Sequence, residues 1–193
     1  MQKCLDCGHE MTEHRENYKY APPDLPGVTL VDVKMIRCDY CGESLLATPK
    51  LSLLVQTRLL ALVRKRTRLT PLEVRYIRAG FAWSGRELAI HMGTTPETVS
   101  RWEHGKLPIG VQADRLLRLM VAHEKELPFS LDELKNVATE PAAELRLRLR
   151  FDETRDAWEA VPDKRHGGAS QNPILAPVPE REPLGTEDTA SRP

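Results

Sequence analysis

The four cysteines of this 193-residue chain form two pairs of equal spacing, Cys4-x-x-Cys7-Gly8 and Cys38-x-x-Cys41-Gly42. In such a pair a tight turn brings two thiolates to one ion, and the glycine permits the positive φ that the turn needs. Four thiolates close a tetrahedral site, favour zinc over iron and leave no position for water. The pattern predicts one structural Zn²⁺ per chain, bound by Cys4, Cys7, Cys38 and Cys41. Two disulfides or a thioredoxin-like redox pair are the alternatives.

The residues around the cysteines, 1–49, predict a small zinc-binding β module. Tyr18–Tyr20 and Val28–Arg37 have strand character because they contain β-branched and aromatic residues. Unbroken alternation in the second run would place on one face Leu30, Asp32, Lys34 and Ile36. A metal suits an antiparallel sheet this small, which has little core of its own. His9 and His14 are expected to be exposed and not to bind the metal.

A connecting helix is predicted over 50–66, where apolar residues recur at steps of three and four. Its apolar stripe would comprise Leu51, Leu54, Val55, Leu59 and Leu62. Such a stripe needs a partner, which is either the following domain or a second copy of the chain.

Helix start signals recur over 67–126 and predict an all-α domain. Thr70-Pro71-Leu72-Glu73 and Ser84-Gly85-Arg86-Glu87 are capping boxes, and Thr95-Pro96 opens a third helix. Gly93 and Gly105 are expected to end the second and third helices. A fourth helix follows residue 110, with a buried stripe predicted at Ala113, Leu116, Leu117, Met120 and Val121.

Residues 127–161 predict a short helix and a β-hairpin. Arginines alternate with apolar residues over 145–151, which favours a half-buried edge strand over a strand that touches nucleic acid. Residues 162–193 are proline-rich with few aromatics and are expected to form a disordered tail. The predicted fold class is therefore α+β: a zinc-binding β module, a connecting helix, an all-α domain and a tail.

Charge is distributed unevenly, although 28 basic and 28 acidic side chains balance over the whole chain. Residues 51–126 carry 13 basic and 7 acidic groups, so this part is the one suited to meet a polyanion. No apolar run reaches the ~18 residues of a membrane span. The first cysteine pair follows the start directly and leaves no room for a signal peptide. We therefore expect a cytoplasmic protein without membrane contact.

The run 86–105 has the spacing of a helix-turn-helix. Ala89 is small where two helices would cross, Gly93 would make the turn, and Val99 would fix the second helix to the core. An ordinary helical bundle is the alternative. The run Val99-Ser100-Arg101-Trp102-Glu103-His104-Gly105 resembles the recognition-helix ending of the XRE (phage-repressor-like) family, whose third helix enters the DNA major groove.

The resemblance implies a set of DNA-facing positions. Arg101 would bind guanine, while Glu97 would either accept from cytosine or only cap its helix. The residues implied to face DNA are Pro96, Glu97, Ser100, Arg101, Gly85, Arg86 and Lys106. Many relatives carry glutamine where this chain has Gly85, so a backbone N–H would have to hold the phosphate there. Further positive charge for phosphates would come from Arg64, Lys65, Arg66 and Arg68.

The order of cysteine pairs, connecting helix and XRE-like run resembles the YgiT-type zinc-finger/helix-turn-helix proteins, which include MqsA-like antitoxins. The resemblance covers about residues 1–125 and implies a homodimer that binds double-stranded DNA and represses its own operon. It also implies that the zinc-bearing half binds a toxin, typically a ribonuclease, where one exists. The DNA-reading asparagine of that family is Glu97 here, which alters the expected operator sequence.

Two other functions fit the same residues. One is an interaction adaptor that works through its zinc module and uses the helix-turn-helix for dimerisation. The other is a redox or metal sensor that loses zinc when its cysteines are oxidised. An enzyme is not expected, because the sequence has no phosphate loop, no recognisable catalytic carboxylate pair and no spare nucleophilic cysteine.

Overall fold

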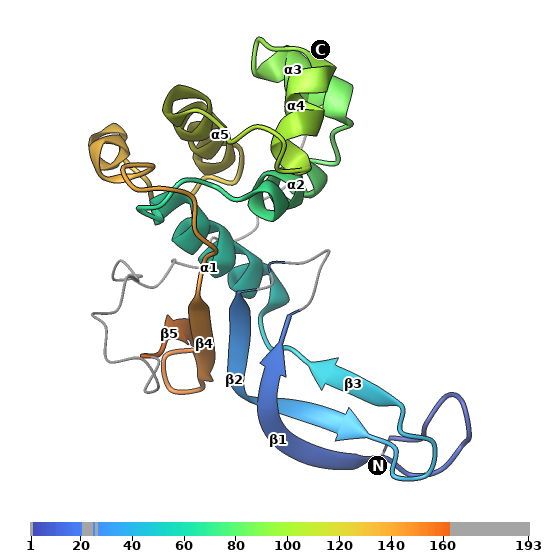
Figure 1. The fold of residues 1–193 in the computed structure, drawn as a ribbon. Coiled ribbons are helices and arrows are strands. Elements are labelled where there is room, and N and C mark those ends of the chain that lie inside the picture. Colours follow the sequence, from blue (N-terminus) through green and yellow to red (C-terminus); the bar gives the residue numbers. More distant parts are fainter. Residues whose placement is uncertain (1, 21–24, 26, 163–193) are drawn as a thin grey trace, which may run out of the picture.

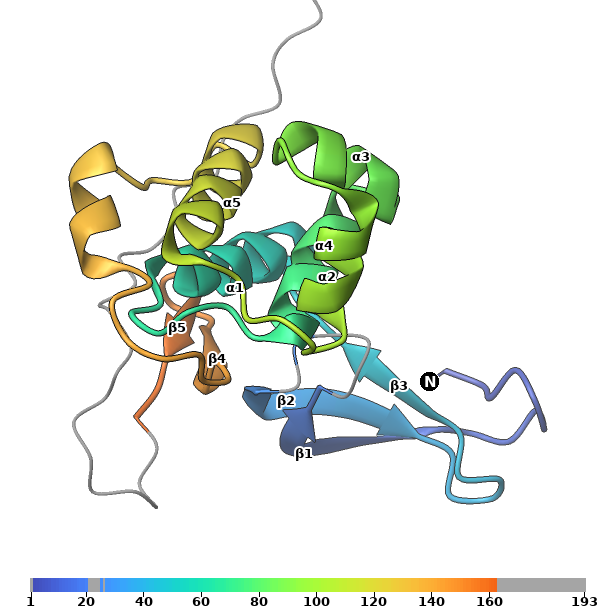
Figure 2. The ribbon, with the colours of Figure 1, turned by 45° about the horizontal axis from the view of Figure 1, so that its top comes forward.

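The computed structural model describes residues 2–20, 25 and 27–162. The expected disordered tail lies outside this range except for Pro162. The described residues form a mixed α/β fold of five strands and six helices (Figures 1 and 2). In chain order these are β1 (Thr12–Lys19), β2 (Val28–Arg37), β3 (Ser44–Ala47), α1 (Leu51–Arg64), α2 (Pro71–Gly80), α3 (Gly85–His91), α4 (Pro96–Glu103), α5 (Val111–Glu124), the 3₁₀ helix η1 (Leu131–Asn136), β4 (Leu147–Asp152) and β5 (Ala157–Ala160).

Strand β2 is the centre of a single five-stranded sheet of order β1-β2-β4-β5, with β3 also paired to β2. One edge of β2 pairs antiparallel with β1. The other edge has two partners in succession: β4 runs parallel to residues 28–30, and β3 runs antiparallel to residues 34–37. The small antiparallel sheet expected within residues 1–49 is therefore extended by two strands from the far end of the described chain.

The ladder between β1 and β2 contains a β-bulge at Asp32. Asn17 of β1 faces both Val31 and Asp32, because the pairing register shifts at this point. Asp32 adopts a φ of 57°, and its N–H donates to Asn17 Oδ1 at 3.1 Å. The bulge therefore places a non-glycine residue in the left-handed region in the middle of the sheet.

The bulge reverses which side chains of β2 point into the core. The buried apolar residues of β2 are Val28 and Leu30 before the bulge, and Val33 and Met35 after it. The unbroken alternation predicted from the sequence, with one face formed by Leu30, Asp32, Lys34 and Ile36, is wrong. One extra residue in a strand moves every later side chain to the opposite face.

The predicted hairpin near the end of the described chain is confirmed. β4 and β5 pair antiparallel from Leu149↔Ala160 to Asp152↔Ala157. Leu147 and Leu149 are fully buried, as the alternating pattern predicts. Both belong to the hydrophobic core cluster that also contains residues of α1.

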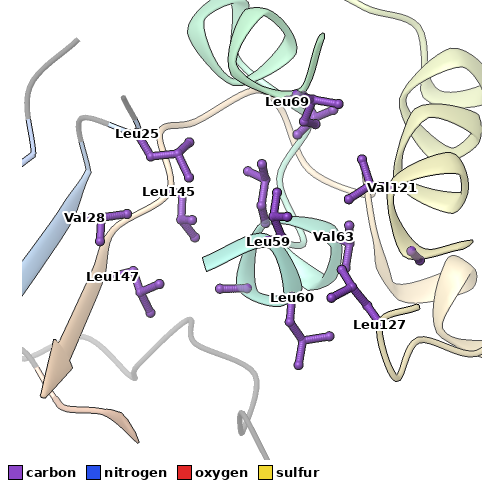
Figure 3. Close-up of a cluster of buried hydrophobic side chains, with 14 of the residues drawn as sticks. Leu25, Val28, Leu59, Leu60, Val63, Leu69, Val121, Leu127, Leu145 and Leu147 are labelled. Carbon is purple, nitrogen blue, oxygen red and sulfur yellow. The ribbon is translucent and has the colours of Figure 1, made fainter. Parts of the chain in front are cut away.

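Helix α1 is the centre of the hydrophobic core, because all its residues from Thr57 to Val63 are buried. It therefore does more than connect two parts of the chain, which was its predicted role. Figure 3 shows Leu59, Leu60 and Val63 between side chains of the sheet region and side chains of the helical region. The neighbours on the two sides include Val28, Leu145 and Leu147, and Val121 and Leu127. The sheet and the helices therefore share one core.

The predicted stripe of α1 is correct at Leu54, Leu59 and Leu62, which are buried. It is wrong at Leu51 and Val55, which are 59% and 36% exposed. In these first turns of the helix, Leu53 and Leu54 are the residues that face the core.

The helix boundaries over 71–124 follow the local start and stop signals. Both capping boxes form, with Thr70 and Ser84 as N-caps, and Thr95 caps α4 by accepting from the N–H of Thr98. Gly93 and Gly105 adopt positive φ just after α3 and α4. The predicted helices are therefore confirmed.

The predicted stripe of α5 holds only in part. Leu117 and Val121 are buried, but Leu116 is 41% exposed and Ala113 and Met120 are half-buried. The other buried positions of α5 are Ala122 and two charged residues, Asp114 and Arg118, which are fully buried. None of the described helices is long and apolar enough to cross a bilayer.

Candidate metal centre and candidate nucleic-acid interface

Two loops of equal geometry, which we call the knuckles, present the four cysteines. The first spans residues 4–8 and the second residues 38–42. In each, the glycine N–H donates to the carbonyl of the first cysteine at 2.9 Å. Gly8 and Gly42 have φ values of 75° and 80°, which explains why glycine follows each pair. The equal spacing in the sequence thus reflects equal turns in the structure.

The knuckles bring all four sulfur atoms within 4.8 Å of one another. Cys7 Sγ lies 3.4 Å from Cys38 Sγ and 3.5 Å from Cys41 Sγ, and Cys4 Sγ lies 3.5 Å from Cys41 Sγ. All four thiols are free, so the disulfide alternative is not the state of this structure. A tetrahedral ion with ~2.3 Å bonds to sulfur needs sulfur atoms roughly 3.8 Å apart. The donor set therefore fits a single metal ion.

The protein environment prepares one of these thiols to be a thiolate. The pKa of Cys38 is lowered to about 6, first by the backbone N–H of Cys41 and also by that of Tyr40. At Cys7 the backbone N–H of His9 acts to lower the pKa, but burial and the neighbouring sulfurs raise it to about 12. Four thiols at these distances compete for negative charge, which a bound cation would balance.

A small cluster supports the metal centre. Cys4, Met11 and Cys38 are buried together, separately from the main core, with Ile36 packed against them. His9 is exposed, hydrogen-bonds to the carbonyl of Cys7 and stacks on the Tyr40 ring at 3.9 Å between centroids. Exposed His14 bonds to Thr12, so neither histidine joins the cysteine cluster, as expected.

Helix α4 has one buried and one exposed face. Val99 and Trp102 are buried against the core. The side chains predicted to face DNA are all exposed: Pro96, Glu97, Ser100 and Arg101. The buried Ala89 lies on α3, which packs on α4. The structure therefore gathers these four residues on one accessible surface.

A bidentate ion pair fixes the last turn of α4. Arg78 of α2 donates from Nε and Nη2 to the two carboxylate oxygens of Glu103, at 2.5 and 3.1 Å. Its Nη1 donates to the carbonyl of Trp83 at 2.7 Å. One guanidinium thus ties together α2, α4 and the turn before α3. This pair could not be predicted from the sequence, because the partners lie 25 residues apart.

Replacing Arg78 by methionine is expected to lower the free energy of unfolding by about 2 kcal/mol, because Glu103 and the Trp83 carbonyl lose a charged donor in a largely buried setting. Urea unfolding followed by circular dichroism measures the change. Arg75→Met, at an exposed position of the same helix, is the matched control and should stay within about 0.5 kcal/mol of the parent. Equal effects of the two substitutions would contradict the proposed clamp.

The other residues expected at a DNA surface lie either next to α3 and α4 or in the segment before α2. Gly85 begins α3, and Arg86 and Lys106 are exposed on either side of α4 in the sequence. Arg66 is exposed and paired with Glu140, and Arg68 is half-buried. All four cationic groups remain on or near the surface.

The phosphate contact predicted for Lys65 is wrong, and Arg64 is partly buried and occupied by an internal contact. Lys65 is buried, pairs with the buried Glu73 and donates to the carbonyl of Ala143. Burial lowers its pKa, although Glu73 acts in the opposite direction. Arg64 is held by Glu133 at 2.7 Å and by the carbonyl of Pro128 at 2.6 Å. The sequence of residues 64–68 predicts a basic surface patch, but Arg64 and Lys65 make internal contacts instead.

The metal centre and the exposed face of α4 lie at opposite ends of the described molecule. Figure 1 shows the knuckles at the far tip of β1, β2 and β3, with α3 and α4 at the other end. No family model, curated protein or solved structure matches this chain. The function must therefore be inferred from the two sites themselves.

Proposed function

We propose that this chain is a sequence-specific DNA-binding regulator whose α3 and α4 form an XRE-type helix-turn-helix. The observation that carries the proposal is the two-faced α4. Pro96, Glu97, Ser100 and Arg101 are exposed, while buried side chains and the Arg78–Glu103 pair fix the helix from behind. A rigid helix with an accessible polar face is what major-groove recognition requires.

In this proposal the first turns of α4 enter the major groove. Arg101 offers a planar fork for O6 and N7 of guanine. The pKa of Glu97 is lowered by its own backbone N–H and by Thr95, which supports the helix-capping role over a cytosine contact. Ser100 lies one position before Arg101 and supplies a small hydroxyl. Base readout therefore rests mainly on Arg101.

Phosphate contacts would flank this helix. The N–H of Gly85 opens α3, and the exposed Arg86 and Lys106 carry positive charge near the two ends of the motif. Without a side-chain clamp at Gly85, these two cations contribute most of the salt-dependent binding. Arg66 and Arg68 are further candidates, whereas Lys65 and Arg64 are not.

The test is selection of duplexes from a random DNA library by the full chain, followed by affinity measurement on the selected sequence. Arg101→Ala is expected to weaken that affinity by about 1–3 kcal/mol, and to weaken nonspecific binding much less. Arg150→Ala removes the same charge from an exposed position on β4 and should leave the preference unchanged. A selected sequence that Arg101→Ala binds as tightly as the parent would refute the assignment of α4.

The metal in this proposal is zinc, bound once per chain by Cys4, Cys7, Cys38 and Cys41 in a structural role. Four thiolates and no open ligand position favour zinc over metals that prefer oxygen or nitrogen. The resemblance to YgiT-type proteins adds a homodimer bound to two half-sites of one operator. Footprints spaced by about 34–36 Å along the duplex would support the dimer.

A second candidate function is recognition of a protein, such as an mRNA-cleaving toxin, by the knuckles. Leu5 is 94% exposed and Tyr40 is 73% exposed, one on each knuckle. Growth of cells that express a neighbouring open reading frame, with and without this chain, tests for a toxin. Rescue that survives the double substitution Leu5→Glu and Tyr40→Ala would exclude the knuckles as the contact.

A further inference from the structure

Strands β3 and β4 share one edge of β2 without meeting each other. The last pair of β4 is Leu30↔Leu149, and the first pair of β3 is Lys34↔Ala47. Residues 31–33 of β2, which include the bulge, lie between the two ladders. A cavity of about 490 Å³ opens at this place. Its size falls within the range of small-molecule sites in proteins, about 300–1,000 Å³.

One wall of the cavity is apolar and held in place. Val33, Ala47, Pro49 and Phe151 contribute to it. The Phe151 ring packs edge-on against buried Trp158, at 5.4 Å between centroids, and Trp158 Nε1 donates to the carbonyl of Pro49 at 3.0 Å. These contacts link the β4–β5 hairpin to the start of α1, so the wall is formed without a ligand.

A guanidinium lies at the same cavity. Arg15 Nη1 lies 3.4 Å from the carbonyl oxygen of Asp32 and 3.5 Å from its carboxylate, and Nη2 lies 3.1 Å from Glu153. A guanidinium has five N–H donors, and the contacts that Arg15 makes within the described residues reach three oxygen atoms. Donors are therefore left for a ligand.

The sign of the ligand charge can be inferred from which charged side chains at the cavity a ligand could displace. Arg15 remains at the cavity, so a cationic ligand would have to share the site with it. An anionic ligand would displace Glu153, whose side chain is 76% exposed. The charged side chains left in the lining would then be the cations Arg15 and Lys34 and the single carboxylate of Asp32. Exposed ion pairs of this kind contribute little to stability, and a carboxylate can replace such a partner with a bidentate contact.

We propose that this cavity binds a small aromatic or alicyclic carboxylate. Its ring lies on the wall of Pro49 and Phe151, and its carboxylate binds Arg15. The ligand would bridge the strands that carry the knuckles and the β4–β5 hairpin. The site is independent of the DNA-binding proposal, since it can be measured in the absence of DNA.

The test is titration calorimetry of the full, metal-loaded chain with 2-naphthoate, 2-naphthylmethylamine and 2-naphthalenemethanol. These probes share the ring and differ in charge. Naphthoate is expected to bind at least about tenfold more tightly than either of the others, because only it can pair with Arg15. Equal affinities of the three probes, or no measurable binding of any at millimolar concentration, would overturn the proposal.

Variants then locate the site. Arg15→Gln should weaken naphthoate binding by about tenfold or more, and Glu153→Gln should strengthen it by removing the competing carboxylate. The control is Arg37→Gln, whose side chain pairs with Glu16 at 2.8 Å and does not line the cavity. If Arg15→Gln fails to fold, the result for Glu153→Gln still decides: unchanged or weaker binding would place the carboxylate elsewhere.

Discussion

Replacing Arg118 by methionine is expected to lower the free energy of unfolding by about 3–5 kcal/mol. The substitution leaves the Asp114 carboxylate in the core without its cation, and both side chains are fully buried. It also removes a donor from several carbonyls: Arg118 Nη1 lies 3.0 Å from Leu62 O and 3.2 Å from Val63 O, and Nη2 lies 2.8 Å from Thr67 O. Arg118 therefore completes the hydrogen bonding at the end of α1.

Urea unfolding at neutral pH measures the loss, provided that the slope with denaturant is unchanged. Arg115→Met is the matched control on the same helix, because Arg115 is half-buried and makes one 3.3 Å bond to the carbonyl of Val137. Its loss should stay below about 1 kcal/mol.

The double variant Asp114→Leu with Arg118→Met separates charge from hydrogen bonding. Removal of both charges is expected to recover part of the stability, because no isolated buried charge remains. The recovery stays incomplete because the carbonyls of α1 and the N–H of Leu69, which donates to Asp114 at 2.6 Å, still lack partners. A double variant as unstable as the sum of the single variants would show that the unpaired charge is not the cause.

The parts of this fold that could be predicted from the sequence depend on local chemistry. A capping box involves residues three positions apart, so Thr70 with Glu73 and Ser84 with Glu87 fix their helix starts regardless of the rest of the chain. A knuckle is likewise closed within five residues. The cysteine cluster was therefore predictable, because two local turns need only to be brought together.

The parts that could not be predicted depend on contacts between distant segments. The parallel pairing of β4 with β2 joins Val28 to Leu147, and neither sequence pattern specifies the other. The bulge at Asp32 has only a weak signal, because aspartate tolerates the left-handed region but is also common on exposed faces. One local insertion then inverted the expected faces of half a strand.

The burial of charged residues also could not be predicted from the sequence. Asp114 and Arg118 are four residues apart, which is the usual spacing of a surface ion pair on a helix. The pair lies in the core because Arg118 donates to buried carbonyls at the end of α1. In the same way Lys65 lies within a basic run, and its burial follows from contacts with Glu73 and the segment before β4. Sequence charge density therefore overestimates the positive charge at the protein surface.

Loss of one metal ligand is expected to abolish metal binding and to unfold the metal-bearing arm, which we define as residues 2–16 and 34–45. Cys38 is fully buried in the small cluster with Cys4 and Met11, and that cluster is separate from the main core. In Cys38→Ser the metal content should fall from one ion per chain to near zero, as measured by atomic emission. A hydroxyl is a poor substitute for a thiolate in a four-sulfur site.

The extent of unfolding should be limited by the position of the bulge. Residues 28–30 of β2 are paired with β4, and Val28, Leu30 and Val33 belong to the main core, whereas the arm beyond Val33 depends on the knuckles for its closure. Hydrogen exchange should therefore become fast in the arm of Cys38→Ser and remain slow in α1 and α5.

Tyr40→Ala, at an exposed position between Cys38 and Cys41, is the control and should retain the metal. Retention of one metal ion by Cys38→Ser would refute the four-cysteine site. Loss of protection in α4 as well would show that the metal centre also stabilises the proposed DNA-binding helices, although the two lie at opposite ends of the molecule.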